Sequence, residues 1–176
     1  MPPTVPRGHL PAQNIVTRSP AETAAVGKAL AGFLRDGDVV LLHGDLGAGK
    51  TRLAKGIAAA LGISEVVSSP SFALVNEYDT ESAAVSRLFH LDLYRLRDES
   101  DLASIGFDDL VASADGVVLI EWPERAAAAL PERFLLIEIE NRGSDERHLR
   151  FVSGPDEDAW AHRIELLRSE LASTPG

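Results

Sequence analysis

Residues 44–51, with the sequence G-D-L-G-A-G-K-T, contain the residue types needed to bind a polyphosphate. Their spacing matches G-x-x-x-x-G-K-[ST], in which small glycines let consecutive backbone N–H groups turn toward an anion. The Lys50 ammonium can reach the β- and γ-phosphates of a nucleotide, and the Thr51 hydroxyl can ligate a bridging Mg²⁺ ion. We therefore expect nucleotide contacts from Asp45, Leu46, Gly47, Ala48, Gly49, Lys50 and Thr51.

The elements on either side of this loop are of the required kinds. Residues 39–42 (VVLL) form a continuous apolar run, which is typical of a strand buried on both faces. A helix is predicted from residue 50 to about residue 61, and its N-terminus would add positive potential at the loop. A chance glycine turn is the alternative, and the order strand, loop, helix argues against it.

Hydrolysis also needs a carboxylate at the end of a neighbouring strand to hold the metal or its waters. Residues 117–120 (VVLI) are the only other run apolar enough to lie beside residues 39–42, and Glu121 follows them directly. Glu121 is therefore predicted to bind Mg²⁺, directly or through water, and is a candidate to activate the attacking water. The alternative is a glutamate that merely ends a strand.

A second carboxylate stands on the segment 88–94, where apolar and polar side chains alternate. His90, Asp92 and Tyr94 share one face of this predicted strand, so His90 and Asp92 could act together near a phosphate. Asp92 could accept a proton from the attacking water or order the water shell of the metal. A hairpin strand with a solvated face explains the same alternation equally well. The catalytic candidates are therefore Asp92, Glu121 and Lys50.

Other polar residues carry weaker signals. Ser69, Pro70, Ser71 and Phe72 form a hydroxyl-bearing loop that could sense the γ-phosphate, although such loops are usually only connections. Arg95, Arg97 and Arg125 are candidates to neutralise transition-state charge, but solvated surface arginines are more common. We expect His43 to be structural. Trp122 follows Glu121 and could stack near a nucleotide, although packing in the protein is the more common role. The histidines show no metal-ligand spacing, so no zinc site is predicted.

Elements predicted along the chain indicate one α/β domain over residues 13–176, preceded by a proline-rich, disordered tail over residues 1–12. Ser19, Pro20 and Glu22 predict a helix start with a capping box. We expect two hairpins, a helix that is divided into two short pieces near Gly106, and a C-terminal helix. The predicted segments are strands at 14–18, 39–42, 72–78, 85–94, 117–120, 134–140 and 147–152, and helices at 98–114, 126–130 and 156–172. They predict a three-layer P-loop NTPase-like fold with a mixed, mostly parallel sheet and β-hairpins.

Composition limits the possible ligands and compartments. The 176 residues carry 17 Lys and Arg against 27 Asp and Glu, a formal net charge of −10. Because such a chain is repelled by phosphate backbones, neither DNA nor free RNA is expected as a direct ligand. The absence of cysteine excludes disulfides, thiolate metal sites and cysteine nucleophiles, and it suits a cytoplasmic location. No apolar run approaches the roughly 20 residues that span a membrane.

Four stretches, taken in order, resemble the TsaE family, small bacterial ATPases of tRNA threonylcarbamoyladenosine biosynthesis. They are the phosphate loop and the segments 69–78 (SPSFALVNEY), 90–96 (HLDLYRL) and 120–125 (IEWPER). The loop is shared by a very large superfamily, whereas the last two segments are much more specific. The resemblance runs from about residue 16 to residue 152.

The resemblance implies a role for the whole chain. It implies a weak, partner-stimulated, Mg²⁺-dependent ATPase in the modification of adenosine 37 of tRNA. Members of the family act with the proteins TsaD and TsaB, so tRNA would be contacted only indirectly, through that complex.

The resemblance also implies roles for particular residues. ATP and Mg²⁺ would be served by Lys50 and Thr51, with Glu121 as a metal-associated acid and Asp92 as a catalytic or metal-proximal carboxylate. Residues 69–72 would behave as a switch-like loop. Ser71 replaces the threonine usual in the family and keeps its hydroxyl. Arg147 falls where a late hairpin approaches the nucleotide.

Two other functions fit the phosphate loop. A small-molecule kinase would need an acceptor pocket and usually an arginine-bearing lid, for which residues 124–133 offer Arg125 and Arg133. A nucleotide-gated binding module would need no productive hydrolysis at all. Transfer of phosphate to water distinguishes the ATPase from the kinase, and the effect of Glu121→Ala on pathway function distinguishes it from the module.

Overall fold

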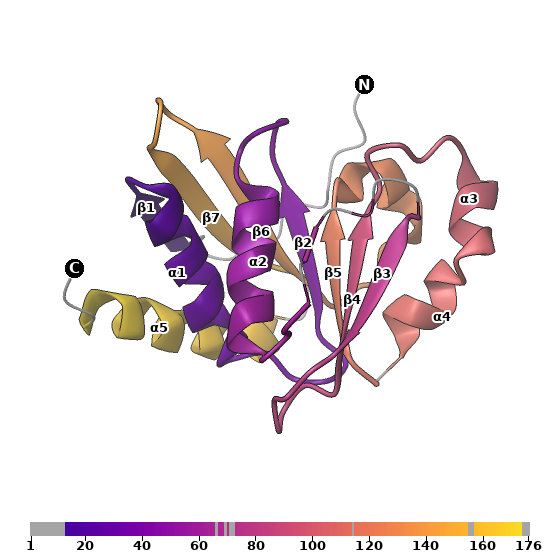
Figure 1. The fold of residues 1–176 in the computed structure, drawn as a ribbon, viewed down its shortest axis with the longest axis horizontal. Helices are drawn as coiled ribbons and strands as arrows, with labels where there is room; N and C mark the ends of the chain where they lie inside the picture. Colours follow the sequence, from indigo (N-terminus) through magenta and orange to yellow (C-terminus); the bar gives the residue numbers. More distant parts are fainter. Residues whose placement is uncertain are drawn as a thin grey trace.

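The structure is a computed structural model that describes residues 13–65, 67–68, 70, 73–113, 115–154 and 157–173. These residues form a seven-stranded sheet with helices packed on both of its faces (Figure 1). The predicted tail, residues 1–12, lies outside the described ranges. Within those ranges, none of the helices combines the length and the apolar character that a membrane crossing requires.

The sheet has the strand order β1-β7-β6-β2-β5-β4-β3. At its centre β2 lies between β5 and β6, and β4 follows β5, all four being parallel. Antiparallel hairpins of β3 with β4 and of β6 with β7 extend it on the two sides, and β1 pairs with β7. The strands are β1 (Gln13–Thr17), β2 (Val39–His43), β3 (Val75–Asp79), β4 (Arg87–Asp92), β5 (Val117–Glu121), β6 (Leu135–Asn141) and β7 (Arg147–Ser153). The predicted mixed sheet, with β3 and β7 running against the other strands, is confirmed.

The helices form the outer layers of the predicted three-layer arrangement. They are α1 (Pro20–Ala31), α2 (Lys50–Ala60), α3 (Glu99–Ser104), α4 (Phe107–Ala112), the 3₁₀ helix η1 (Pro123–Ala129) and α5 (Glu157–Ser173). The start of α1 follows the predicted cap, because the Ser19 hydroxyl accepts the Glu22 N–H at 3.1 Å. The Glu22 carboxylate accepts the N–H of Arg18 at 2.7 Å, one residue before the usual position in a capping box.

Each face of the sheet has its own hydrophobic core. Along β2, Val40 and Leu42 pack under α1, α2 and α5, whereas Val39 and Leu41 pack under α3, α4 and η1. This alternation is what a strand covered on both sides requires. The continuous apolar run of β2 therefore fixes the strand that leads into the phosphate loop at the centre of the molecule.

Two glycines allow α1 and α2 to cross closely. A Cβ atom on Gly27 would lie 2.4 Å from the carbonyl oxygen of Leu53, and one on Gly56 would lie 2.1 Å from that of Ala24. Both distances are far inside van der Waals contact, so any side chain here would push the helices apart. The close crossing holds α2, whose N-terminus follows the phosphate loop, against α1.

Some sequence predictions need correction. β2 has two parallel neighbours rather than β5 alone, because β6 pairs with it through Leu135 to Ile137. The second half of β6 carries Glu138 and Glu140, which is the pattern of a solvated hairpin strand. The sequence therefore did not indicate that β6 lies beside β2. The helix predicted at 126–130 is the 3₁₀ helix η1, which begins at Pro123. β3 begins at Val75, and Phe72, the predicted start, lies outside the described residues.

Candidate active site

The phosphate loop connects β2 to α2 through backbone conformations that need glycine. Gly47 and Gly49 have φ angles of 78° and 111°, in the left-handed region that L side chains rarely adopt. A Cβ atom on Gly44 would lie 2.5 Å from the carbonyl oxygen of Ile139. The N-cap Gly49 provides no side chain to occupy the first N–H groups of α2. These N–H groups and the helix dipole therefore favour the binding of an anion at the N-terminus of α2.

Lys50 is held at the base of this loop. Its ammonium donates to the carbonyl oxygens of Gly44 at 2.5 Å and Asp45 at 2.8 Å, and it lies 4.1 Å from the centre of the Trp122 ring. Burial lowers the pKa of Lys50, although the nearby carboxylates of Glu121 and Glu124 partly oppose this effect. A buried ammonium with a single N–H left after two carbonyl bonds is suited to bind a phosphate oxygen.

Glu121 joins the phosphate loop to the strand beside it. The hydroxyl of Thr51 donates toward both carboxylate oxygens of Glu121, at 3.3 Å each. His90, on the next strand, lies with its Nε2 atom 2.8 Å from Glu121 Oε1. Glu121 is 2% exposed and His90 is fully buried. The alternative of a solvated face on β4 is therefore wrong for His90, because its ring reaches across to β5 instead of into water.

Asp92 stands beside Glu121 at the same edge of the sheet. The two residues are paired in register on the parallel strands β4 and β5. Asp92 Oδ1 accepts the N–H of Tyr94 at 3.0 Å. Asp92 and Glu121 line a cleft of about 300 Å³ together with Leu46, Gly47, Gly49, Lys50, Thr51, Arg52, Lys55, Tyr94 and Trp122. Predicted phosphate-binding and acidic residues thus meet in one cleft.

Trp122 forms one wall of this cleft. Its φ of 59° is the positive value of a non-glycine residue, a conformation found in strained functional backbone. The ring lies beside that of Tyr94, with centroids 4.8 Å apart and planes inclined by 47°. Trp122 therefore packs against Tyr94 and also contacts the Lys50 ammonium. Its stacking near a nucleotide stays a prediction.

His43 and Glu124 connect the end of β2 to η1. His43 Nδ1 lies 3.0 Å from Glu124 Oε2. This hydrogen bond raises the pKa of His43, and burial opposes it only in part. Burial works to raise the pKa of Glu124, but the hydrogen bond from His43 and nearby positive charge outweigh it, so that pKa is lowered. His43 is thus a structural residue, as expected, and it holds the segment after Trp122 against the phosphate-binding strand.

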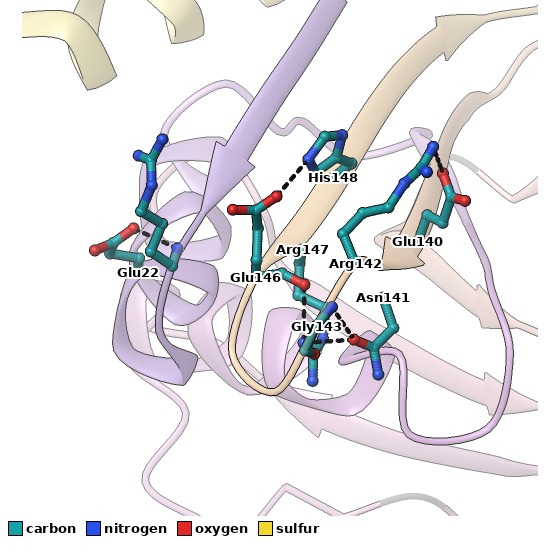
Figure 2. A network of polar contacts seen from close by, with 9 residues as sticks. Glu22, Glu140, Asn141, Arg142, Gly143, Glu146, Arg147 and His148 are labelled. Carbon is teal, nitrogen blue, oxygen red and sulfur yellow. Dashed lines mark hydrogen bonds and ion pairs between the residues drawn. The ribbon is translucent and has the colours of Figure 1, made fainter.

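Arg147 braces the phosphate loop from the β6–β7 hairpin. Its Nε atom donates to the carbonyl oxygen of Ala48 at 2.9 Å. Figure 2 shows the same guanidinium holding the hairpin turn together, through Nη1 bonds to Asn141 Oδ1 at 3.0 Å and to the carbonyl oxygens of Gly143 and Glu146 at 3.2 and 3.0 Å. The residue predicted to approach the nucleotide therefore contacts the loop that would hold it.

A smaller cavity lies on the Arg147 side of the phosphate loop. It measures about 130 Å³ and is lined by Pro20, Thr23, Gly47, Gly49, Arg52, Asp145 and Arg147. Gly47, Gly49 and Arg52 also line the main cleft, so the two cavities meet at the loop. An elongated ligand held on this loop could extend into both.

The oxygen atoms of Thr51 and Glu121 fit a magnesium ion. Hydroxyl and carboxylate oxygens are the hard ligands that Mg²⁺ prefers, and here they already lie in contact. The described residues contain no group of three or more His, Asp or Glu side chains that could hold a metal alone. This agrees with the usual binding of Mg²⁺ by one or two protein oxygens together with substrate phosphates.

The remaining candidates do not line the cleft itself or lie outside the described residues. Arg95, Arg97 and Pro70 line a neighbouring cavity of about 710 Å³, which shares Leu46, Asp92 and Tyr94 with the cleft. Ser69, Ser71 and Phe72 lie outside the described residues. Arg125 lines a separate cavity that shares no residue with the cleft. Sequence reasoning missed Arg52 and Lys55, two cations that line the cleft in addition to Lys50. Their spacing of one and four residues from Thr51, on the first turns of α2, was the available signal.

The chain is similar to known proteins over most of its length. A family model described as "Threonylcarbamoyl adenosine biosynthesis protein TsaE" matches residues 17–149. The chain is 41% identical over 156 residues to the "tRNA threonylcarbamoyladenosine biosynthesis protein TsaE" of Bacillus subtilis, covering 89% of this chain and 91% of that protein. A protein of the same name from Treponema pallidum is 41% identical over 124 residues, 70% of this chain and 88% of its own.

A solved structure is also similar. The crystal structure of Bacillus subtilis YdiB superimposes with a TM-score of 0.71 at 36% sequence identity, covering 94% of this chain and 97% of that one. The match therefore extends over nearly the whole of both chains. The chain belongs to the TsaE family.

Proposed function

We propose that this chain is the ATP-binding and ATP-hydrolysing component of tRNA threonylcarbamoyladenosine biosynthesis, dependent on Mg²⁺. The observation that carries the proposal is the contact of Thr51 in the phosphate loop with Glu121 at the end of β5, beside the buried Lys50. A nucleotide-binding loop alone would need no carboxylate against its threonine. Their contact supports a site built for metal-assisted phosphoryl transfer.

Phosphate binding falls to the loop and its cations. Backbone N–H groups at the start of α2 would surround the β-phosphate, and the Lys50 ammonium would turn from the Gly44 and Asp45 carbonyls toward the phosphate oxygens. Thr51 and Glu121 would hold Mg²⁺, which supplies neutralisation of charge on the β- and γ-phosphate oxygens. Arg52 and Lys55, on the cleft wall, add positive charge in an otherwise acidic protein.

Asp92 is the better placed of the two carboxylates to accept a proton from water. Glu121 is already engaged by Thr51 and His90 and is almost fully buried. Asp92 lines the same cleft, and the bond it receives is a backbone N–H to one of its oxygens. We therefore assign Glu121 to the metal and Asp92 to positioning the attacking water and accepting its proton.

The nucleoside would extend over the loop toward Arg147. The smaller cavity begins at Gly47, Gly49 and Arg52, on the far side of the loop from Asp92 and Glu121. Phosphates in the main cleft would leave the ribose and base directed to this side. Arg147 would then contribute to nucleotide binding mainly by holding the Ala48 carbonyl and the hairpin turn in place.

A partner complex completes the proposal. TsaD and TsaB are the expected partners, in the cytoplasm, with tRNA contacted through them. The net charge of −10 supports this division, since an acidic chain complements a basic partner better than it binds RNA. Leu46, 76% exposed, and Tyr94, 42% exposed, stand at the cleft. Exposed apolar side chains there support a partner contact that senses the nucleotide.

The kinase alternative gains no support from the arginines suggested for its lid. Arg125 lines a cavity that shares no residue with the cleft, and Arg133 lines another beside Trp160. The destination of the γ-phosphate tests the proposal. When ATP is hydrolysed in ¹⁸O-labelled water, the ¹⁸O atom should appear in the released phosphate. Transfer of phosphate to a metabolite, with none released to water, would establish the kinase instead.

A further inference from the structure

His90 is buried beside the proposed metal site, where an apolar side chain would be the simpler choice. It lies on β4 two residues before Asp92, pairs in register with Leu119 of β5, and its ring reaches Glu121. The side chain is fully buried, and among the described residues its Nδ1 atom has no hydrogen-bond partner. A buried polar atom without a partner is unfavourable, so packing alone does not explain a histidine here.

The hydrogen bond with Glu121 defines the state of the ring. An ionised carboxylate only accepts hydrogen bonds, so His90 Nε2 carries the proton and donates it to Glu121 Oε1 at 2.8 Å. The unpartnered Nδ1 then holds a lone pair rather than a second buried N–H without an acceptor. The ring is therefore the Nε2–H tautomer, and its single polar contact is directed at Glu121.

This bond restricts the Glu121 carboxylate. Oε1 receives both His90 and Thr51, and Oε2 lies within 3.3 Å of the Thr51 hydroxyl. With His90 fixed inside the sheet, rotation of the carboxylate away from Thr51 would break the 2.8 Å bond and leave a buried donor unpaired. Partners of this kind behind a ligating group commonly change metal affinity or activity by about 10–100-fold when removed.

We propose that His90 is a positioning residue that holds the Glu121 carboxylate against Thr51 in the orientation that binds Mg²⁺. The inference rests on the proposed function, since it assigns a role within the same site. His90 itself touches neither the phosphates nor the water, and it acts only through Glu121.

Two substitutions of His90 separate positioning from packing. His90→Met fills the buried space without a donor, whereas His90→Gln keeps an N–H near the position of Nε2. Leu88→Met is the matched control, because Leu88 is equally buried on the same strand two residues earlier. The measurements are the Mg²⁺ concentration at half-maximal binding of a fluorescent ATP analogue, kcat and KM for ATP, and the melting temperature of each variant.

His90→Met is expected to raise the Mg²⁺ requirement of nucleotide binding about 10-fold or more and to lower kcat by a similar factor. The KM for ATP at saturating Mg²⁺ should stay within about threefold. His90→Gln should recover most of both effects, and Leu88→Met should show neither. A folded His90→Met variant with the Mg²⁺ dependence of the wild type would overturn the proposal. A wild-type protein that neither binds nor hydrolyses ATP would overturn the proposed function instead.

A measurement on the wild-type protein decides the case if His90→Met does not fold. ¹⁵N-labelled histidine spectra should show His90 as the Nε2–H tautomer, and Glu121→Gln should shift its Nε2 resonance. A proton on Nδ1 with a bare Nε2 would contradict the proposed bond to Glu121 and would overturn the inference without any measurement of activity.

Discussion

Asp92 and Glu121 occupy paired positions at the carboxyl ends of the parallel strands β4 and β5, and both side chains line the cleft above the phosphate loop. Their surroundings differ, because Glu121 is enclosed by Thr51 and His90 while Asp92 receives the N–H of Tyr94. Two neighbouring carboxylates in different surroundings can take different tasks, which is the basis of the first prediction.

Asp92→Asn and Glu121→Gln should fail in different ways. Asp92→Asn is expected to lower kcat by about 100-fold or more, as loss of a proton acceptor does, with Mg²⁺-dependent nucleotide binding almost unchanged. Glu121→Gln should raise the Mg²⁺ concentration needed for binding by about 10-fold or more. Steady-state ATPase assays and Mg²⁺ titrations of a fluorescent ATP analogue measure both. Identical defects in the two variants would contradict the division of roles.

Arg147→Ala should weaken nucleotide binding without changing its Mg²⁺ dependence. The substitution removes the bond to the Ala48 carbonyl and those that hold the hairpin turn, so the phosphate loop loses its brace. We expect the Kd for ATP to increase about 10-fold or more, in line with about 1.5–3 kcal/mol for a hydrogen bond to a charged group. Arg142→Ala is the control, since Arg142 on the same hairpin pairs with Glu140 at the surface. Equal effects of the two substitutions, measured by calorimetry, would refute the brace.

Tryptophan emission should report nucleotide binding through Trp122. Lys50 lies 4.1 Å from the Trp122 ring, and phosphate binding would draw the ammonium away from it. The chain has two tryptophans, and Trp160 lies on α5 against Arg163 and does not line the cleft. ATP should therefore change the emission of Trp160→Phe but leave that of Trp122→Phe almost constant. A change carried by Trp160 would place the rearrangement elsewhere.

The His43–Glu124 pair predicts a dependence of stability on pH. The pKa of His43 is raised above its ordinary 6.5, so its stabilising effect is full below pH 6.5 and is lost as the pH rises through the folded value. The pKa of Glu124 is lowered below 4.5, so its contribution is lost as the pH falls through that lower value. Denaturant unfolding of His43→Gln should show a smaller decline in stability above pH 6.5 than the wild type. A decline equal to that of the wild type would contradict a contribution of this pair to the pH dependence.

Much of the fold follows from local patterns in the sequence. The runs at residues 39–42 and 117–120 have the continuous apolar pattern that is typical of strands buried on both faces, and Ser19 marks the start of α1. The second parallel neighbour of β2 was not predictable in this way. β6 is buried where it pairs with β2 and solvated beyond, and the pattern of a half-buried strand does not reveal its neighbour.

The site was predictable as far as each residue carried its own chemistry. Lys50, Thr51, Asp92 and Glu121 meet in one cleft because parallel strands bring their carboxyl ends to the same edge. The hydrogen bond between His90 and Glu121 depends on which strands are neighbours and on burial. The alternation along β4 was equally typical of a solvated face, so it did not indicate that His90 is buried. The contact of Arg147 with Ala48 joins residues 99 positions apart, so no local pattern could predict it.

The proposed function depends on ATP hydrolysis that is coupled to a partner complex. The most direct test is the rate of phosphate release from ATP by the wild-type protein, alone and with TsaB, TsaD and tRNA, at saturating Mg²⁺. We predict slow hydrolysis by the protein alone and a clear increase when the partners are added. Equal rates with and without the partners, or tight binding of tRNA by the isolated protein at physiological salt, would contradict the account.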